Sequence, residues 1–199
     1  TTKLIIECLI GIVALWLIQP GAYILVFSGK PVAVVPFMAI SLSLVWIIWM
    51  TNVYNFMDGV DGFVASQAIL SSTVIAGWFL FHGDVTIALM CLSLGGSGIG
   101  FLFFNWAPAK IFLGDAGSLT LGVIFALLLI YGIFVHQIPV IAFILVHGVC
   151  LLDATVTLVR RILSREKWWE AHAAHFYQRA VRTGVSHRRV SIIAVLLSG

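Results

Sequence analysis

Long apolar stretches alternate with short polar connections along the whole chain. Each stretch is close to the 20 residues that a transmembrane helix needs, and none shows the alternation of a β-barrel strand. Because a backbone exposed to lipid must satisfy its own hydrogen bonds, the stretches are predicted to be helices. We therefore predict an all-α fold, a polytopic transmembrane helical bundle. Its predicted spans are 4–26, 32–50, 63–81, 85–104, 119–135 and 138–158, with a truncated seventh that begins near residue 190.

The composition supports this prediction. Of the 199 residues, 61% are hydrophobic and 10% are charged, whereas a soluble domain carries about 25% charge. The apolar stretches recur to the end of the chain, so a cleaved secretory signal does not explain them. No polar region is long enough for a separate soluble domain, and residues 1–199 are predicted to form a single membrane-embedded unit.

The basic residues predict the orientation of the chain in the membrane. If the chain starts on the cytoplasmic side, ten of its eleven Lys and Arg residues fall on that side and only Lys30 falls outside. This bias is the positive-inside pattern of membrane proteins. The net charge of +3 is then a consequence of topology, and no nucleic-acid partner is predicted. The ten inside residues are Lys3, Lys110, Arg160, Arg161, Arg165, Lys167, Arg179, Arg182, Arg188 and Arg189.

Three polar connections fall on the predicted cytoplasmic side: the first connection (51–62), the second (105–118) and the third (159–189). In the first, Asn52, Asn55, Asp58 and Asp61 recur every third residue, so a helix-like turn would place them on roughly one face. Two carboxylates so close repel each other unless a cation, a basic group or a shared proton intervenes. The alternative is a solvated loop in which one aspartate caps the next helix. That alternative leaves the two asparagines unexplained.

The second connection ends in IFLGDAGS, where Asp115 lies between two glycines just before a predicted helix. Backbone N–H groups at the helix start could hold a phosphate. Asp115 could bind Mg²⁺, which takes one or two carboxylates together with phosphate oxygens. Phe112 offers a flat surface for a base or a sugar ring. The alternative is an ordinary helix cap with turn glycines, and no Walker A sequence is present.

The third connection is the longest and the most basic. His172 and His175 are three residues apart and would share a face of a helix. No further zinc ligands accompany them, so a zinc site is not predicted. Arg179 could bind a pyrophosphate with two hydrogen bonds. An amphipathic surface helix anchored by Trp168 and Trp169 is an equally open alternative.

A few polar or small residues lie inside the predicted spans. Glu7 and Asp153 are near the inner ends of their spans, where each is expected to pair with an arginine. His147 is predicted to be a packing residue. The glycines of 95–100 form a small-residue face suited to close helix packing, and that face would also permit a homodimer.

Three sequences occur in a fixed order, NVYNFMDGVDG, FNWAPAKIFLGDAGSLTLG and HAAHFYQRAVRTGVSHRRV. Together they resemble the polyprenyl-phosphate N-acetylhexosamine-1-phosphate transferases, which are glycosyltransferases of the family 4 type. The resemblance covers essentially the whole chain. It implies transfer of a sugar-1-phosphate from a UDP-N-acetylhexosamine to undecaprenyl phosphate, or another polyprenyl phosphate, with release of UMP. It also implies a bacterial plasma membrane enzyme that initiates a cell-surface glycan such as the O-antigen of lipopolysaccharide.

The resemblance also implies roles for individual residues. Asp115 would hold the Mg²⁺, for which Mn²⁺ could substitute, and Phe112 would stack beside the uracil. The histidine loop would contact the sugar-phosphate part and help to select the sugar. The implied catalytic residues are Asp58, Asp61 and Asp115, and the implied substrate-binding residues are Asn52, Asn55, Phe112, His172, His175 and Arg179.

Two departures from the family pattern bear on these expectations. The family has an earlier aspartate-rich motif that this sequence lacks, so we expect a portion of a longer enzyme that is inactive alone. The family's common-antigen branch has paired histidines where this chain has Phe176-Tyr177-Gln178. The segment is more similar to the O-antigen branch, which favours modified amino sugars such as UDP-N-acetylfucosamine.

A polytopic transporter for a nucleotide-sugar or another anionic solute is the alternative function. A transporter would place ionisable groups at mid-membrane depth along a path and would tend to contain inverted repeats. Here the carboxylates gather in connections on one predicted side, and no convincing inverted repeat is found. The pattern therefore favours the transferase.

Overall fold

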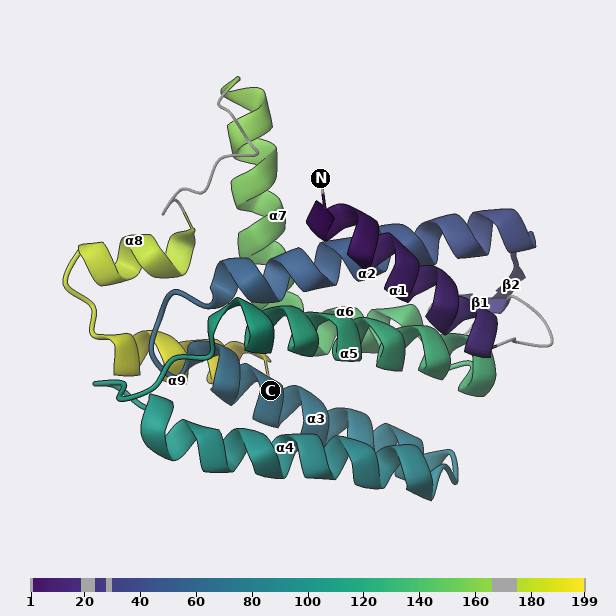
Figure 1. The fold of residues 1–199 in the computed structure, drawn as a ribbon, viewed down its shortest axis with the longest axis horizontal. Coiled ribbons are helices and arrows are strands. Elements are labelled where there is room, and N and C mark those ends of the chain that lie inside the picture. Colours follow the sequence, from purple (N-terminus) through teal and green to yellow (C-terminus); the bar gives the residue numbers. More distant parts are fainter. Residues whose placement is uncertain (1, 19–23, 28–29, 166–174, 199) are drawn as a thin grey trace. The chain divides into compact units, whose positions relative to one another are not determined.

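The computed structural model describes residues 2–18, 24–27, 30–165 and 175–198, and most of these are helical. Contacts between residues divide the chain into two compact units, and each is described by itself. The first unit is Thr1–Asn55 with Asp115–Leu145, and the second is Phe56–Gly114 with Val146–Gly199. The predicted helical bundle is confirmed, whereas the prediction of a single unit stays a prediction. The elements are α1 (Thr2–Ile18), β1 (Ile24–Phe27), β2 (Lys30–Ala33), α2 (Pro36–Met57), α3 (Phe63–Phe81), α4 (Val85–Asn105), α5 (Gly114–His136), α6 (Val140–Val146), α7 (Gly148–Leu163), α8 (Phe176–Arg182) and α9 (His187–Ser198) (Figure 1).

Fewer spans than predicted are found in the part of the chain that the structure describes. Within the described residues, the four helices α2 to α5 are long and apolar enough to cross a membrane. The pair α6 and α7 is bent by 84° at its break and adds a fifth span if the two cross together. The predicted seventh span corresponds to the 12-residue α9.

The predicted span 4–26 is wrong at its end. Helix α1 ends at Ile18, and the apolar residues 24–27 instead form β1, which pairs antiparallel with β2. Short apolar runs rich in β-branched and aromatic residues suit a strand as well as a helix. Hydropathy alone does not separate the two.

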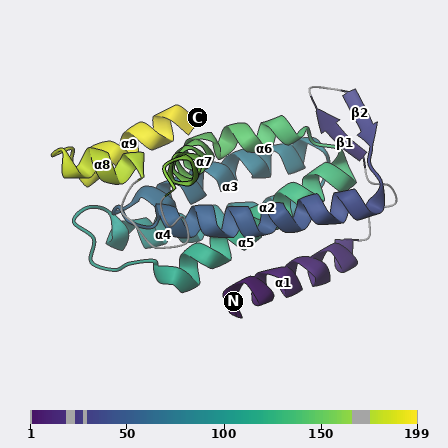
Figure 2. The same ribbon diagram turned by 90° about the horizontal axis from the view of Figure 1, so that it is seen from above.

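In the first unit, α1, α2 and α5 lie next to one another (Figures 1 and 2). Helix α5 approaches α2 closely at Gly122, where a Cβ would lie 2.5 Å from Thr51 Cα and 2.7 Å from the Met50 carbonyl oxygen. One turn away the rings of Tyr54 and Phe125 stack with centroids 5.2 Å apart. The absence of a side chain at Gly122 therefore allows the two backbones to touch.

In the second unit, α3 and α4 run side by side and are joined by a short turn (Figures 1 and 2). Asp84 caps α4 by accepting a hydrogen bond from the Ile87 N–H at 3.1 Å. A Cβ on Gly98 would lie 2.9 Å from the Ile69 side chain, and Gly95 likewise faces α3. The predicted close packing at these glycines is confirmed.

A side chain of the second unit, Gln67, forms a hydrogen bond to the backbone at the bend between α6 and α7. Gln67 donates to the Val146 carbonyl oxygen at 2.7 Å and accepts from the Ser198 hydroxyl at 3.1 Å. His147 is 1% exposed at the break, in line with the predicted packing role. Gln67 thus satisfies a carbonyl that the interrupted helix leaves without its usual partner.

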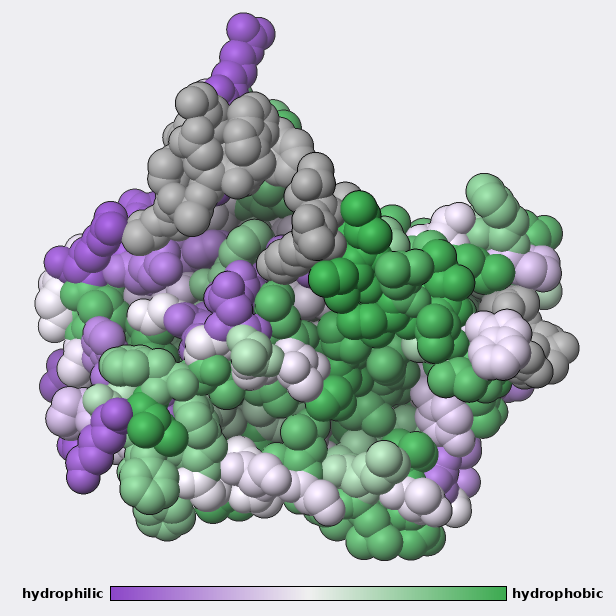
Figure 3. Space-filling model, in the orientation of Figure 1, coloured by the Kyte–Doolittle hydropathy of each residue, from purple (hydrophilic) through white to green (hydrophobic). Residues whose placement is uncertain are grey.

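Large hydrophobic side chains are exposed on both units. Phe37, Phe81 and Phe103 are more than four-fifths exposed, at 82%, 88% and 81%. Figure 3 shows hydrophobic side chains over much of the face that it presents. Exposed apolar surface of this extent is unusual for a soluble monomer and fits helices surrounded by lipid.

Candidate active site

Asp115 lies in the first turn of α5, directly after Gly114, and its side chain is exposed. Asn55, in the last turn of α2, donates its amide N–H groups to Asp115 Oδ1 at 2.9 Å and to the Ser118 hydroxyl at 3.1 Å. Gly114 has a φ of +64°, which glycine adopts without strain. The first unit thus brings together two predicted site residues that are 60 positions apart in the sequence.

Asp115 could hold a magnesium ion whose other ligands come from outside the chain. Mg²⁺ is commonly held by one or two carboxylates, with phosphate oxygens and water completing its octahedron. In the described part of the chain, no group of three or more His, Cys, Asp or Glu side chains gathers to enclose an ion. A metal at Asp115 would therefore take most of its ligands from phosphate and water, while Asn55 holds the carboxylate in place.

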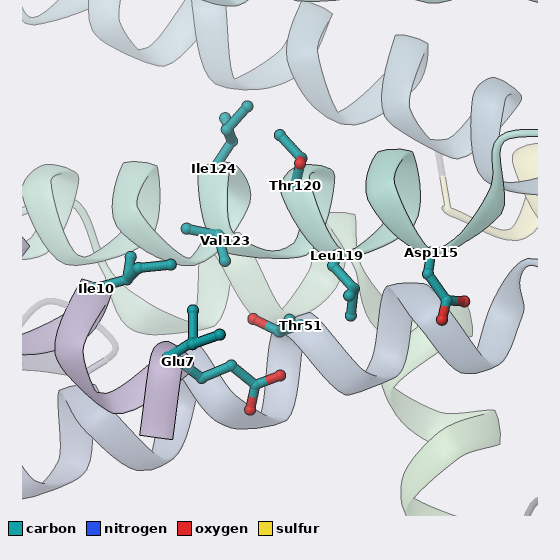
Figure 4. A pocket seen from close by; sticks show the side chains of 9 residues that line it. Glu7, Ile10, Thr51, Asp115, Leu119, Thr120, Val123 and Ile124 are labelled. Atoms are coloured by element: carbon teal, nitrogen blue, oxygen red, sulfur yellow. The ribbon is translucent and has the colours of Figure 1, made fainter. Parts of the chain in front are cut away.

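An apolar pocket of about 610 Å³ in the first unit has Asp115 at one end (Figure 4). Side chains of α1, α2 and α5 form its walls. Two polar residues in the walls, Glu7 and Thr51, are only 5% and 1% exposed. The lining residues are Ile6, Glu7, Ile10, Thr51, Asp115, Leu119, Thr120, Val123 and Ile124.

The helix of the first connection does not extend to its two aspartates. Helix α2 ends at Met57, so Asp58 and Asp61 lie in the turn that follows it. Gly62 in that turn has a φ of +74°, a conformation that interrupts a helix. Asn52 remains on α2, where its amide donates to the Ile48 carbonyl oxygen at 2.7 Å.

In the second unit, Asp61 joins the first connection to the second connection and to α9. Its Oδ2 accepts from the Ala109 N–H at 3.1 Å, and its Oδ1 lies 3.5 Å from His187 Nδ1. Its backbone carbonyl accepts from the Ser191 hydroxyl at 2.9 Å. The carboxylate therefore holds loop segments together, and its predicted catalytic role stays a prediction.

The third connection is described from His175 onward, and the predicted residues His172, Trp168 and Trp169 lie outside the described residues. His175 precedes α8 as its N-cap, and the shared face predicted for it and His172 stays a prediction. Its Nδ1 is 3.3 Å from Asp153 Oδ1 on α7. The expected arginine partner of Asp153 is thus replaced by a histidine.

Tyr177 packs the start of α8 against the first connection within the second unit. Its hydroxyl donates to the Phe56 carbonyl oxygen at 2.6 Å. Its ring stacks on Phe63 and on His175, with centroids 5.3 and 5.8 Å apart. A Cβ on Gly59 would lie 2.7 Å from the Tyr177 hydroxyl oxygen, so any side chain at this position would require Tyr177 to shift.

This packing predicts a pH dependence of stability. Burial, and then the nearby charge of Asp153, raise the pKa of Tyr177 above its ordinary value of 10.0. The folded protein keeps the phenol protonated at a pH where the unfolded chain loses its proton, so the stabilisation is complete below pH 10 and falls as the pH rises above it. Tyr177→Phe should cost about 1 kcal/mol at neutral pH because one hydrogen bond is lost.

The measurement is thermal unfolding of wild type and Tyr177→Phe in detergent from pH 7 to 11. The difference in unfolding temperature between the two proteins should narrow above pH 10. A difference that is constant across this range would contradict the buried position of the phenol.

Two of the remaining predicted site residues are exposed, and the third is partly buried. Phe112 in the second connection is 75% exposed, and Arg179 on α8 is exposed. Asp58 is partly buried and close enough to Tyr177 to affect its pKa. The sequence did not predict that Asp153 contacts His175 or that Tyr177 packs against the first connection. The one signal for Asp153 was the presence of an acidic residue inside an apolar stretch.

A profile of glycosyl transferase family 4 matches residues 1–133 of the chain. The chain belongs to this family. It is 36% identical over 164 residues to a probable undecaprenyl-phosphate N-acetylglucosaminyl 1-phosphate transferase of Bacillus subtilis (strain 168), covering 81% of this chain and 46% of that protein. It is 31% identical over 182 residues to a decaprenyl-phosphate N-acetylglucosaminephosphotransferase of Mycobacterium leprae (strain TN), with the same two coverages.

A third relative is a phospho-N-acetylmuramoyl-pentapeptide-transferase of Streptococcus pneumoniae serotype 19F (strain G54). It is 35% identical over 120 residues, covering 60% of this chain and 36% of that protein. The chain thus spans about half, or less, of the length of these curated relatives. The family predicted from the three sequence motifs is confirmed, and none of the three relatives is named as a transporter.

Proposed function

We propose that this chain forms part of a Mg²⁺-dependent transferase that moves N-acetylhexosamine-1-phosphate from a UDP-sugar to a polyprenyl phosphate such as undecaprenyl phosphate. The observation that carries this proposal is the position of Asp115. An exposed carboxylate, held by Asn55, lies at one end of an apolar pocket in the first unit. Such a pocket suits an amphipathic acceptor whose phosphate is near the carboxylate and whose prenyl chain contacts the apolar walls.

The chemistry needs charge stabilisation more than proton transfer. A lipid phosphate oxygen attacks the β-phosphorus of the UDP-sugar and forms a new P–O bond. The bond between that phosphorus and the oxygen bridging to the α-phosphate breaks, and UMP leaves with the electron pair. The acceptor phosphate is already largely ionised near pH 7, since its second pKa is about 6. Bound magnesium would supply neutralisation of the phosphate oxygens.

The chain's own residues would bind and orient the reactants. Asn55 would fix Asp115, and the N–H groups at the start of α5 would favour a phosphate. Phe112 would stack on the uracil. Arg179 would contact the sugar-phosphate together with the histidine loop, which consists of His172 and His175. For Asp58 and Asp61 we propose a catalytic contribution. Asp61 would also hold neighbouring loop segments in place through its contacts with them.

We further propose a bacterial plasma membrane location with the three polar connections facing the cytoplasm. The bias of the basic residues supports this orientation. The product would initiate a cell-surface glycan of the O-antigen type. We include a homodimer in the proposal, because a Cβ would meet no atom within 4 Å at Gly96 or at Gly100, and α4 therefore has room for a second copy.

The test is UMP release by the full-length protein in detergent from a panel of UDP-N-acetylhexosamines. Release should require both undecaprenyl phosphate and Mg²⁺, and the fastest sugar identifies the branch of the family. Mn²⁺ should restore part of the rate after chelation. Uptake of intact nucleotide-sugar into vesicles without UMP release would support the transporter and overturn the proposal.

A further inference from the structure

Asp153 is a buried carboxylate in the second unit that accepts hydrogen bonds from backbone N–H groups at the start of α8. It is 8% exposed, and His175 is also 8% exposed. Asp153 Oδ1 accepts from the Phe176 N–H at 2.9 Å, and Oδ2 accepts from the Tyr177 N–H at 3.3 Å. The Thr157 hydroxyl donates to Oδ1 from the next turn of α7 at 3.1 Å. These contacts make Asp153 an N-terminal cap for a helix that is not its own.

We propose that Asp153 is the positioning residue for His175, fixing both the orientation of its ring and the nitrogen that carries its proton. His175 Nδ1 lies 3.3 Å from Asp153 Oδ1. An ionised carboxylate can only accept hydrogen bonds, so Nδ1 must be the donor. Nε2 is then the nitrogen available to the sugar-phosphate part of the donor substrate. This inference rests on the proposed function, in which His175 contacts that part.

Two aromatic rings restrict the imidazole further. The Phe56 ring lies 5.8 Å from the His175 ring at an angle of 30°, and the Tyr177 ring lies 5.8 Å away at 26°. A ring in contact with two aromatic neighbours and bonded through Nδ1 has little freedom to rotate. In metal sites, removing a partner that orients a histidine in this way typically lowers metal affinity or activity by about 10–100-fold.

The first test needs no variant. Full-length protein with ¹⁵N-labelled histidine is measured by NMR in detergent, and His175 is assigned from the signal lost in His175→Gln. The account predicts a protonated, hydrogen-bonded Nδ1, and Asp153→Asn should change that signal. A wild-type His175 that carries its proton on Nε2 alone would overturn the proposal, whether or not the protein is active.

The second test is a double-mutant cycle on kcat/KM for UMP release. Asp153→Asn alone should lower this rate by about 10–100-fold. In a His175→Ala background the same change should cost less than about 3-fold, because residues that act through one another are not additive. Additive losses would show a role independent of His175 and would overturn the proposal.

Thr157→Val provides the matched control. It removes a donor from the same carboxylate without touching the His175 ring, and it should leave kcat/KM within about 3-fold of wild type. A loss equal to that of Asp153→Asn, with the His175 signal unchanged, would show that the carboxylate only stabilises the fold. If the wild type released no UMP but showed the predicted Nδ1 signal, the proposed function would fail while the positioning of His175 stood.

Discussion

Asp115→Asn should lower UMP release by at least about 10²–10³-fold, the size of loss expected when one charge-stabilising group is removed from a transition state. The amide is almost the same size as the carboxylate, and Asp115 is exposed in the first turn of α5. Folding should therefore be preserved. Asn55 can still donate to the amide oxygen, so the variant removes charge with little change in shape. The measurement is the rate of UMP release at saturating Mg²⁺, with thermal unfolding recorded in parallel.

Asp84→Asn is the control for Asp115. Asp84 also begins a helix, and its side chain accepts from the Ile87 N–H. It lies in the turn between α3 and α4, in none of the three polar connections. Asparagine is an equally good cap, so both stability and rate should stay near wild type.

An Asp115→Asn protein that turns over within about 3-fold of wild type would overturn the metal assignment.

Gly122→Ala should strongly destabilise the first unit. The added Cβ would lie 2.5 Å from Thr51 Cα and 2.7 Å from the Met50 carbonyl oxygen, and both are backbone atoms of a helix. No rotamer change relieves a clash with backbone, so α2 and α5 would have to separate. The cost should reach about 3 kcal/mol or more, at or above the usual range for overpacking. The measurement is the yield of monodisperse protein and its midpoint of thermal unfolding in detergent.

Gly77→Ala is the matched change for Gly122→Ala. Gly77 also lies within a long apolar helix, α3, but nothing is within 4 Å of the position that its Cβ would take. Since alanine is the better helix former by about 1 kcal/mol, this variant should be as stable as wild type or slightly more stable. Equal unfolding midpoints for the two variants would contradict the close approach of α2 and α5.

The sequence was most informative where polar connections bound a single apolar stretch. The predicted spans 63–81 and 85–104 match α3 and α4 almost residue for residue. It was least informative where hydropathy stays high across a change of structure. Residues 24–26 and 32–33, which belong to the two strands, lie inside stretches that were predicted as continuous spans, and so does the bend at His147.

The candidate site was predictable as a set of residues and not as a set of contacts. The spacing of Asn55, Asp58 and Asp61 drew attention to the first connection, but α2 ends between them at Met57. Asn55 then bonds to Asp115, and Asp61 bonds to the second connection and α9. Partners separated by 60 or 126 residues depend on how helices pack, which local spacing does not encode.

The central claim is that the bond broken lies between the two phosphates of the UDP-sugar. The most direct measurement uses UDP-N-acetylglucosamine labelled with ³²P on the β-phosphate, together with undecaprenyl phosphate, Mg²⁺ and the full-length protein. The label should enter the lipid fraction in step with the release of unlabelled UMP. Label that stays in water as UDP would show transfer of the sugar alone, and label that stays in the intact nucleotide-sugar would show no transfer; either result would contradict the account.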